Sequence, residues 1–349
     1  MVNLLLSRTL EDVKGRAVRA LFRLPLGVLR ALAGRPVVIE GKTLDPEMQL
    51  ILKLQNLEGP DFAALPIGRG RRALVAGARI VGGNPPVGSV CDRAVAGPEG
   101  ELMLRFYTPR DATATTPALL YIHGGGFVYG DLDNYDAVCR FLAERAGVRV
   151  VAIDYRLAPE HGFPAAVDDV LAAYRWVVEH AEGLGIDPER VAVGGDSAGG
   201  NLAAVVAQQT VGSDAAPVFQ LLIYPLTDMA EVWPSRRSFA DGFFFSTLFR
   251  DVIDTHYAAS APDRWDPRIS PLYGDVTGVA PAYLVTAGFD PLLDEGKAYA
   301  DKLADTGVQV EYVCEEGLIH SFANMVSLGR SGPEAMARAA EALRRGLAR

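Results

Sequence analysis

Short apolar runs rich in β-branched residues alternate with longer amphipathic stretches along most of the chain. The runs predict strands at residues 102–107, 118–122, 148–155, 191–194, 219–224, 282–286 and 308–313, with a weaker candidate at 92–95. The stretches predict helices over residues 136–146, 167–182, 199–210, 293–306 and from 334 to the C-terminus. Apolar strands separated by helices are typical of a mostly parallel sheet with helices on both faces. The short turn Gly97-Pro98-Glu99-Gly100 predicts an antiparallel edge to this α/β fold.

Two segments interrupt the alternation. Residues 16–33 have the pattern of a basic amphipathic helix, kinked or divided at Pro25, and residues 46–57 form a second helical stretch. The Gly-, Arg- and Pro-rich residues 66–86 predict a linker. The second interruption, at about 225–280, is rich in Trp, Phe and Pro, and insertions this long are often lids. The chain therefore divides into an N-terminal segment, residues 1–80, and a domain, residues 81–349, that carries the insertion.

Composition narrows the class of protein. With 349 residues, 49% hydrophobic and 22% charged, the chain is neither disordered nor fibrous. Its net charge of −9 argues against general binding to nucleic acid, which requires many cations facing phosphates. Three widely spaced cysteines argue against a disulfide framework and against a Cys-built zinc site, and they favour a reducing, cytoplasmic compartment.

Membrane contact is a separate question. No apolar run reaches 18 residues, and the first ten residues lack the basic start of a signal peptide. A basic amphipathic helix such as residues 16–33 can lie weakly on a membrane surface. We favour the alternative, in which the helix at residues 16–33 packs on its own protein.

Gly195-Asp196-Ser197-Ala198-Gly199 fits the G-x-S-x-G pattern between an expected strand and an expected helix. In that context a sharp turn holds the central serine in strained geometry at the edge of the sheet. Small residues two positions to either side avoid a collision across the turn, and the helix N-terminus favours developing negative charge. The motif predicts Ser197 as a nucleophile rather than as a mere helix cap.

His123-Gly124-Gly125-Gly126-Phe127 follows the expected strand at residues 118–122. Glycines leave backbone N–H groups uncovered, and such a loop after this strand forms an oxyanion hole in lipases and esterases. We expect the donors to be Gly124, Gly125 and, directly after the nucleophile, Ala198. A phosphate-binding loop is the alternative, but the GK[ST] ending is missing.

A serine hydroxyl needs a base to take its proton. His320 follows the last expected strand, where a loop can reach the nucleophile. The other histidines lie in the glycine loop, a turn, a helix end and the insertion: His123, His161, His180 and His256. His320 is therefore the predicted base.

The base in turn needs a carboxylate to orient it. Asp290 follows the expected strand at residues 282–286 and completes the chain order Ser, Asp, His of α/β-hydrolases. Asp294 and Glu295 are rivals, but they fall in the next helix. Asp196 is expected to brace the loop around the nucleophile. Asp290 is therefore the predicted acid.

Taken together, these motifs resemble the hormone-sensitive-lipase family of α/β-hydrolases, the bacterial carboxylesterases with a GDSAG sequence. The resemblance rests on HGGGF at 123–127, DYRLAPEH at 154–161, GDSAGGNL at 195–202 and DPLLD at 290–294, in the family's order. It implies an α/β-hydrolase fold with an eight-stranded sheet, and a helical cap built from the N-terminal segment and the insertion. It also implies the triad Ser197, Asp290 and His320, and the same oxyanion donors.

The resemblance adds pocket candidates. Residues 241–246 are similar to a cap segment that lines the acyl pocket in relatives, and the alternative is plain cap core. The candidate pocket residues are aromatic: Phe127, Phe243, Phe244 and Phe245. Tyr155, Arg156 and Glu160 of the DYRLAPEH segment are expected to form a structural network instead.

The implied activity is that of a serine carboxylesterase acting on small, uncharged esters of short to medium acyl chains, with no metal and no cofactor. An N-acyl amidase or deacetylase with the same triad is the alternative within enzymes. A hydrolase-fold ligand receptor is the alternative outside them, although such receptors usually lack a triad member. A homodimer is a further expectation, because relatives often form one.

Overall fold

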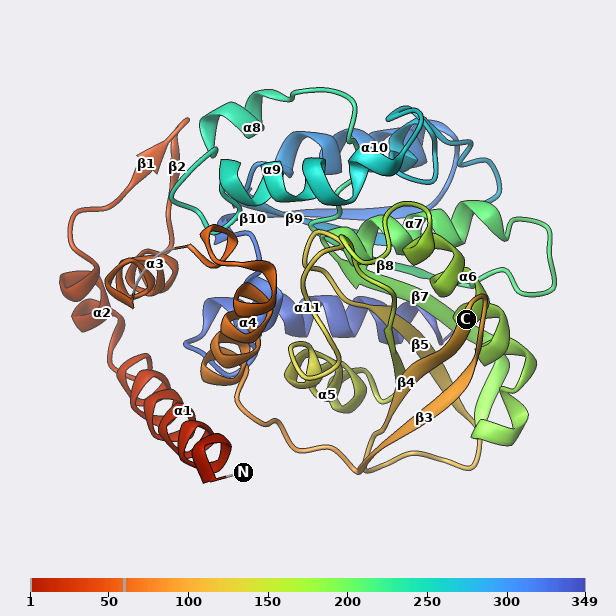
Figure 1. The fold of residues 1–349 in the computed structure, drawn as a ribbon, viewed down its shortest axis with the longest axis horizontal. Coiled ribbons are helices and arrows are strands. Elements are labelled where there is room, and N and C mark those ends of the chain that lie inside the picture. Colours follow the sequence, from red (N-terminus) through yellow and green to blue (C-terminus); the bar gives the residue numbers. More distant parts are fainter. Residues whose placement is uncertain (1, 59–60, 349) are drawn as a thin grey trace.

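The computed structural model describes residues 2–58 and 61–348, and its centre is one eight-stranded sheet (Figure 1). Its strand order is β10-β9-β8-β7-β5-β6-β4-β3. The strands are β3 (Ser89–Gly97), β4 (Gly100–Thr108), β5 (Thr116–Ile122), β6 (Arg149–Asp154), β7 (Ile186–Asp196), β8 (Gln220–Ile223), β9 (Ala282–Phe289) and β10 (Val310–Ile319). From β10 to β6 the pairs are parallel, which confirms the α/β class and the mostly parallel sheet.

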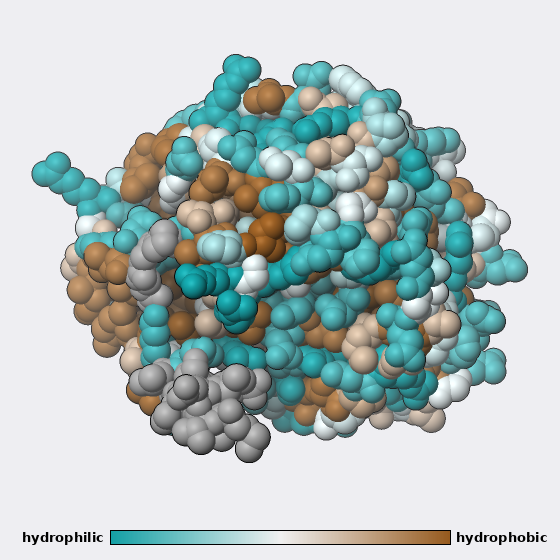
Figure 2. All heavy atoms as spheres, in the orientation of Figure 1, coloured by the Kyte–Doolittle hydropathy of each residue, from teal (hydrophilic) through white to brown (hydrophobic). Residues whose placement is uncertain are grey.

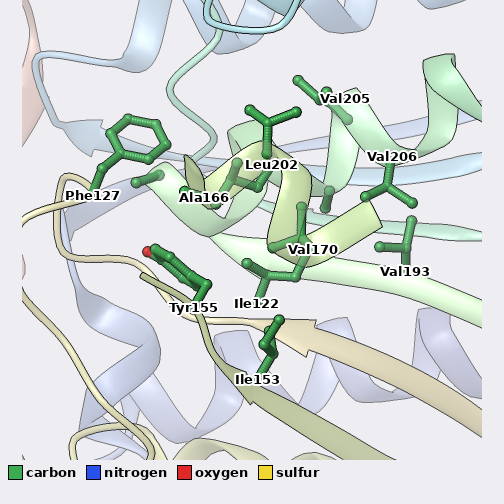
Figure 3. Close-up of a cluster of buried hydrophobic side chains, with 14 of the residues drawn as sticks. Ile122, Phe127, Ile153, Tyr155, Ala166, Val170, Val193, Leu202, Val205 and Val206 are labelled. Carbon is green, nitrogen blue, oxygen red and sulfur yellow. The ribbon is translucent and has the colours of Figure 1, made fainter. Parts of the chain in front are cut away.

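Helices cover both faces of the sheet because successive residues of each central strand point to opposite sides. On β5, Leu120 and Ile122 join one buried cluster, whereas Leu119 and Tyr121 join another. Figure 3 shows the first cluster, where Ile122 meets Val170. The covering helices are α6 (Ala165–Glu179), α7 (Ala198–Gln209) and α10 (Leu293–Asp305) on the first side, and α5 (Asp136–Ala146) and α11 (Ser331–Gly346) on the other.

The antiparallel edge is also confirmed. β3 and β4 pair from Ser89 opposite Thr108 to Gly97 opposite Gly100, so the predicted turn closes a hairpin. β4 then pairs antiparallel with β6. The sheet therefore changes direction at this edge, away from the ends of the strands that carry the predicted site.

The N-terminal segment is helical: α1 (Val2–Leu21), α2 (Leu26–Ala33), α3 (Pro46–Glu58) and α4 (Ile67–Gly82). A short hairpin, β1 (Val38–Ile39) with β2 (Lys42–Thr43), separates α2 from α3. The division at Pro25 is confirmed, since α2 starts directly after it. The linker predicted at residues 66–86 is wrong, because α4 occupies most of it and ends at Gly83 with φ +66°. The expectation about a signal peptide concerns the first ten residues, whose side chains lie outside the described part.

A buried carboxylate ties this segment to the far end of the chain. Glu47 of α3 is 1% exposed, and its Oε2 accepts hydrogen bonds from the N–H groups of Arg330 (2.7 Å) and Ser331 (3.0 Å). The Arg330 guanidinium adds an ion pair at 3.1 Å. Arg71 of α4 binds Glu160 at 2.7 Å. The N-terminal helices are therefore fixed on the domain by charged contacts as well as by packing.

The insertion between β8 and β9 contains α8 (Pro234–Ser238) and α9 (Thr247–His256), at the top of the view beside α10 (Figure 1). Arg236 of α8 forms an almost fully buried ion pair with Glu295 of α10. Asn201 of α7 donates to the carbonyl oxygens of Leu226 and Ile269. Both ends of the insertion are thus held on the domain.

Two further properties of the fold concern its cysteines and the hydrophobicity of its helices. Cys91, Cys139 and Cys314 are free thiols. Within residues 2–58 and 61–348, no helix is both long enough and apolar enough to cross a bilayer.

Candidate active site

Ser197 lies at the turn from β7 into α7, with φ 54° and ψ −119°. A non-glycine residue adopts a positive φ only under strain, and this strain raises the hydroxyl above the sheet. A Cβ at Gly195 or Gly199 would overlap the carbonyl oxygen of Ile122 on the neighbouring strand. The two glycines let β7 and α7 approach β5 closely enough to make the turn.

Ser197, His320 and Asp290 form a hydrogen-bonded chain at the carboxyl ends of β7, β10 and β9. His320 Nε2 lies 3.0 Å from Ser197 Oγ, and His320 Nδ1 lies 2.7 Å from Asp290 Oδ2. All three residues are almost fully buried. Asp290 Oδ1 accepts the N–H of Leu292 at 2.8 Å. A carboxylate at Nδ1 keeps the proton there, so Nε2 is free to accept the serine proton.

Aromatic rings surround the imidazole of His320. The ring of Tyr224 lies 4.7 Å away, and the ring of Phe245 approaches edge-on at 5.0 Å. The Tyr224 hydroxyl also accepts the N–H of Ala323. These contacts hold the imidazole in one position and keep water from its faces.

Asp196 binds the glycine loop and so confirms the expected brace. Its Oδ1 accepts the N–H of Gly124 at 2.9 Å and the hydroxyl of Tyr121 at 2.8 Å. Its Oδ2 accepts the hydroxyl of Tyr135 at 3.3 Å. Burial raises the pKa of Asp196 to about 6, although these hydrogen bonds oppose the shift.

The same bond contradicts the predicted role of Gly124 in an oxyanion hole, because its N–H is already taken by Asp196. By contrast, no acceptor within the described residues binds the N–H groups of Gly125, Gly126 and Ala198. Ala198 is the first residue of α7, where helix geometry leaves the N–H free. Three adjacent donors remain available beside Ser197.

The four phenylalanine candidates separate into different environments. Phe127 is fully buried and stacks on Tyr257 with ring centroids 3.9 Å apart, at the edge of the core in Figure 3. Phe243 packs between Phe239 and Phe289. Both pack in the core, and neither lines the cavity described next. The other two, Phe244 and Phe245, face the cavity described next and His320 respectively.

An apolar cavity of about 350 Å³ lies beneath the N-terminal helices. Its wall includes Phe244 and Ser321, the residue after His320. The remaining lining comes from α1, α3, α4 and the segments beside them: Val18, Ile51, Leu54, Gln55, Phe62, Leu65, Ala73, Leu74, Gly77, Ala78, Ile80, Val81, Asn134, Asn324 and Met325. These wall residues of the N-terminal helices were not among the predicted pocket residues, although the apolar spacing of residues 46–57 was a signal for them.

The remaining candidates act structurally. Asp294 accepts the N–H of Ser235, and Glu295 pairs with Arg236, so neither contacts His320. In the DYRLAPEH segment, the Tyr155 hydroxyl donates to the His123 carbonyl oxygen. Arg156 and Glu160 pair with charged residues elsewhere: Asp169, Glu99 and Arg71. The predicted bracing network is confirmed. Across the described residues, no cluster of His, Cys, Asp and Glu could hold a metal ion.

Comparison with known proteins identifies the family. Residues 119–324 match a family model described as "alpha/beta hydrolase fold". The chain belongs to this family. That membership confirms the resemblance to the hormone-sensitive-lipase group.

Similar proteins of this family are ester hydrolases. Carboxylic ester hydrolase LipN of Mycobacterium tuberculosis is 43% identical over 89% of this chain and 86% of its own length. Ethyl acetate hydrolase of Pseudomonas putida is 44% identical over 70% and 79%. The solved ester-hydrolase EH1AB1 from the Lake Arreo metagenome matches with a TM-score of 0.83 at 41% identity, covering 88% of this chain and all of that one. This α/β-hydrolase is accordingly a carboxylic ester hydrolase with small-molecule esters as substrates.

Proposed function

We propose that the chain is a serine carboxylesterase that hydrolyses uncharged esters of short to medium acyl chains through an acyl-enzyme on Ser197. The observation that carries the proposal is the hydrogen-bonded chain from Ser197 Oγ through His320 to Asp290. Its distances of 3.0 and 2.7 Å let a proton move from the hydroxyl to the imidazole without rearrangement.

In the first half of the reaction, Ser197 Oγ attacks the ester carbonyl carbon while its proton passes to His320 Nε2. The carbonyl oxygen becomes an oxyanion, and Asp290 stabilises the imidazolium that has formed. The C–O bond to the alcohol then breaks, and the leaving oxygen takes the proton from His320. In the second half, water gives its proton to His320 and attacks the acyl carbon, which releases the acid and restores Ser197.

We place the oxyanion between the N–H groups of Gly125, Gly126 and Ala198. These groups have no acceptor among the described residues, whereas Gly124 is bound to Asp196. Each such donor typically lowers the barrier by about 3 kcal/mol. A Cβ at Gly126 would press on Ile253 and Phe249, and one at Gly125 would overlap the backbone of Tyr129. Only glycines fit this loop, which supports its role.

The apolar cavity is our candidate for the acyl-chain site. Ser321, the residue after His320, and Phe244 form part of its wall. A volume of about 350 Å³ is at the small end of ligand pockets, which supports short or medium chains. A relative named ethyl acetate hydrolase is consistent with such substrates.

The test is hydrolysis of p-nitrophenyl esters from acetate to palmitate by the wild type and by Ser197→Ala. We expect a rate maximum at short or medium chains, and a loss of about 10⁴- to 10⁶-fold in kcat in the variant. Ser213→Ala, in the turn after α7 and away from the site, is the control. Circular dichroism shows whether each variant is folded. Retained activity in a folded Ser197→Ala variant would overturn the assignment of the nucleophile.

A further inference from the structure

The N-terminal segment differs in charge from the rest of the molecule. Residues 1–91 contain thirteen Lys and Arg against seven Asp and Glu, although the whole chain carries −9. Between residues 13 and 39 there are six basic residues and no acidic one. This stretch covers the end of α1, all of α2 and the loop after it.

Four of these six basic residues have side chains that are exposed to solvent and form no ion pair within the described part of the chain. Arg16, Arg23, Arg30 and Arg35 have no ion-pair partner among the described residues. Arg16, Arg23 and Arg30 are spaced seven residues apart. Arg19, by contrast, is turned inward and donates to the carbonyl oxygens of Arg79 and Ile80. Among the described residues, the side chains of these four arginines form no ion pair or hydrogen bond that would hold α1 and α2 on the protein.

Apolar side chains accompany these arginines on the surface. Leu24, Leu26, Val28 and Leu32 are 37–43% exposed, whereas Leu29 on the other side of α2 is fully buried. Figure 2 shows brown surface gathered at the left of the view, where Figure 1 places α2 and α3. One apolar face of helix α2 thus packs into the core, and a second apolar face is exposed to solvent.

We propose that this surface, Arg16 to Arg35, docks on a bilayer that contains anionic phospholipid. Exposed leucine and valine beside arginines are typical of helices that lie in the interface plane of a membrane. Acidic headgroups supply the negatively charged partners that the four arginines lack among the described residues. The proposal is independent of the esterase chemistry, since neither the four arginines nor the four exposed apolar residues belong to the site or line the cavity.

A second copy of the chain fits this surface poorly. In a two-fold dimer the same patch meets itself, so Arg16, Arg23 and Arg30 would face their own counterparts. Like charges placed opposite one another without acidic partners repel. A lipid surface meets the charge requirement, and its acyl region accepts the apolar side chains.

Docking would also bring the cavity close to the bilayer. Helix α2 packs on α3, and Ile51 and Leu54 of α3 line the cavity. Val18 of α1 lines it as well. An ester dissolved in the membrane would therefore travel only a short distance to enter the cavity.

The test is flotation of the full chain with vesicles of phosphatidylcholine alone and with vesicles containing 30% phosphatidylglycerol. We expect binding only to the anionic vesicles, and loss of binding as salt is raised. Each arginine near an anionic surface raises partitioning about fivefold, so Arg16→Gln/Arg23→Gln/Arg30→Gln together should lower it roughly 100-fold. Val28→Ser/Leu32→Ser should also weaken binding.

The matched control is Arg175→Gln on α6, an exposed arginine without an ion-pair partner among the described residues, on the opposite side of Figure 1. It should leave flotation unchanged, and all variants should hydrolyse a soluble ester at the wild-type rate. Equal binding to both kinds of vesicle, or equal loss in the control, would overturn the proposal. So would a dimer in light scattering that the triple variant breaks, because a second copy would then occupy the surface.

Discussion

At the scale of single residues, the juxtaposition of the proposed triad was predictable because each side chain stands in a short motif at a fixed place in the strand order. Ser197, Asp290 and His320 follow β7, β9 and β10, and the parallel sheet brings those strand ends together. Gly124 was not predictable in the same way. Its N–H is bound by Asp196, a contact between residues 72 positions apart that depends on how the loop closes.

Phe127 illustrates the same limit. Its φ of 61° turns the ring away from the glycine loop and onto Tyr257 of the insertion. A left-handed residue reverses the direction of a side chain, and only the tertiary contact makes that conformation favourable. The sequence placed Phe127 beside the site but could not give its direction.

Asp196 carries a prediction about pH. Burial raises its pKa from 3.8 to about 6, so between these values the folded protein holds a proton that the unfolded chain releases. The contribution of this group to stability therefore falls as pH rises through that window. In the Asp196→Asn variant this position cannot ionise. The free energy of unfolding of the variant minus that of the wild type should therefore rise by about 2 kcal/mol from pH 4.5 to pH 7.5.

Urea unfolding of both proteins at the two pH values measures this gain. The control is Asp214→Asn, an exposed residue, whose difference from the wild type should stay constant. A constant difference for Asp196→Asn as well would mean that the carboxyl group titrates normally in the folded protein.

At the scale of elements, α4 was missed because its sequence has the composition of a loop. Gly68, Gly70, Gly77 and Gly82 each lower helix propensity by about 1 kcal/mol relative to alanine. Packing compensates for this cost. A Cβ at Gly70 would press on the Phe62 carbonyl oxygen and the ring of Tyr129, so the glycine allows α4 to approach the domain closely.

Gly77 offers a test of the cavity as the acyl-chain site. It lines the cavity, and a Cβ added there meets no atom within 4 Å. Gly77→Leu should therefore fold, reduce the space beneath α4 and move the preferred p-nitrophenyl ester to a shorter chain. The ratio of kcat/KM for octanoate and acetate should fall about tenfold, the usual effect of one or two methylene groups in a pocket.

The control for this prediction is Gly68→Leu on the same helix, outside the cavity lining and with similarly open surroundings. It should raise the stability of α4 without changing the ratio. An unchanged ratio in Gly77→Leu would place the acyl chain elsewhere.

At the scale of the whole molecule, the sequence predicted the layers of the domain but not how the N-terminal helices sit on it. The alternation of apolar strands and helices is local information, and the rules of parallel sheets convert it into a fold. The position of α3 depends instead on Glu47 and Arg330, which are 283 residues apart. No periodicity in the sequence records that pairing.

Replacing Glu47 should therefore loosen the molecule as a whole. Glu47→Ala leaves two N–H groups, of Arg330 and Ser331, without their acceptor and removes a charged partner. We expect a loss of about 2–3 kcal/mol in the free energy of unfolding, measured in urea. Glu47→Gln keeps an acceptor and should lose less. Glu179→Ala, at an exposed position of α6, should change stability by less than about 0.5 kcal/mol. Equal effects of the three changes would show that the buried contact does not hold α3.

The contact between Glu47 and Arg330 also has a consequence during protein synthesis. Helix α3 leaves the ribosome early, but the backbone groups that bind its carboxylate are made 283 residues later. At about 5–20 residues per second, this delay lasts about 15 to 60 seconds. Through that time α3 lacks part of its final partners, among them strand β10, on which it packs. The contacts that fix one of the first helices to be translated can therefore be completed only when nearly the whole chain has been made.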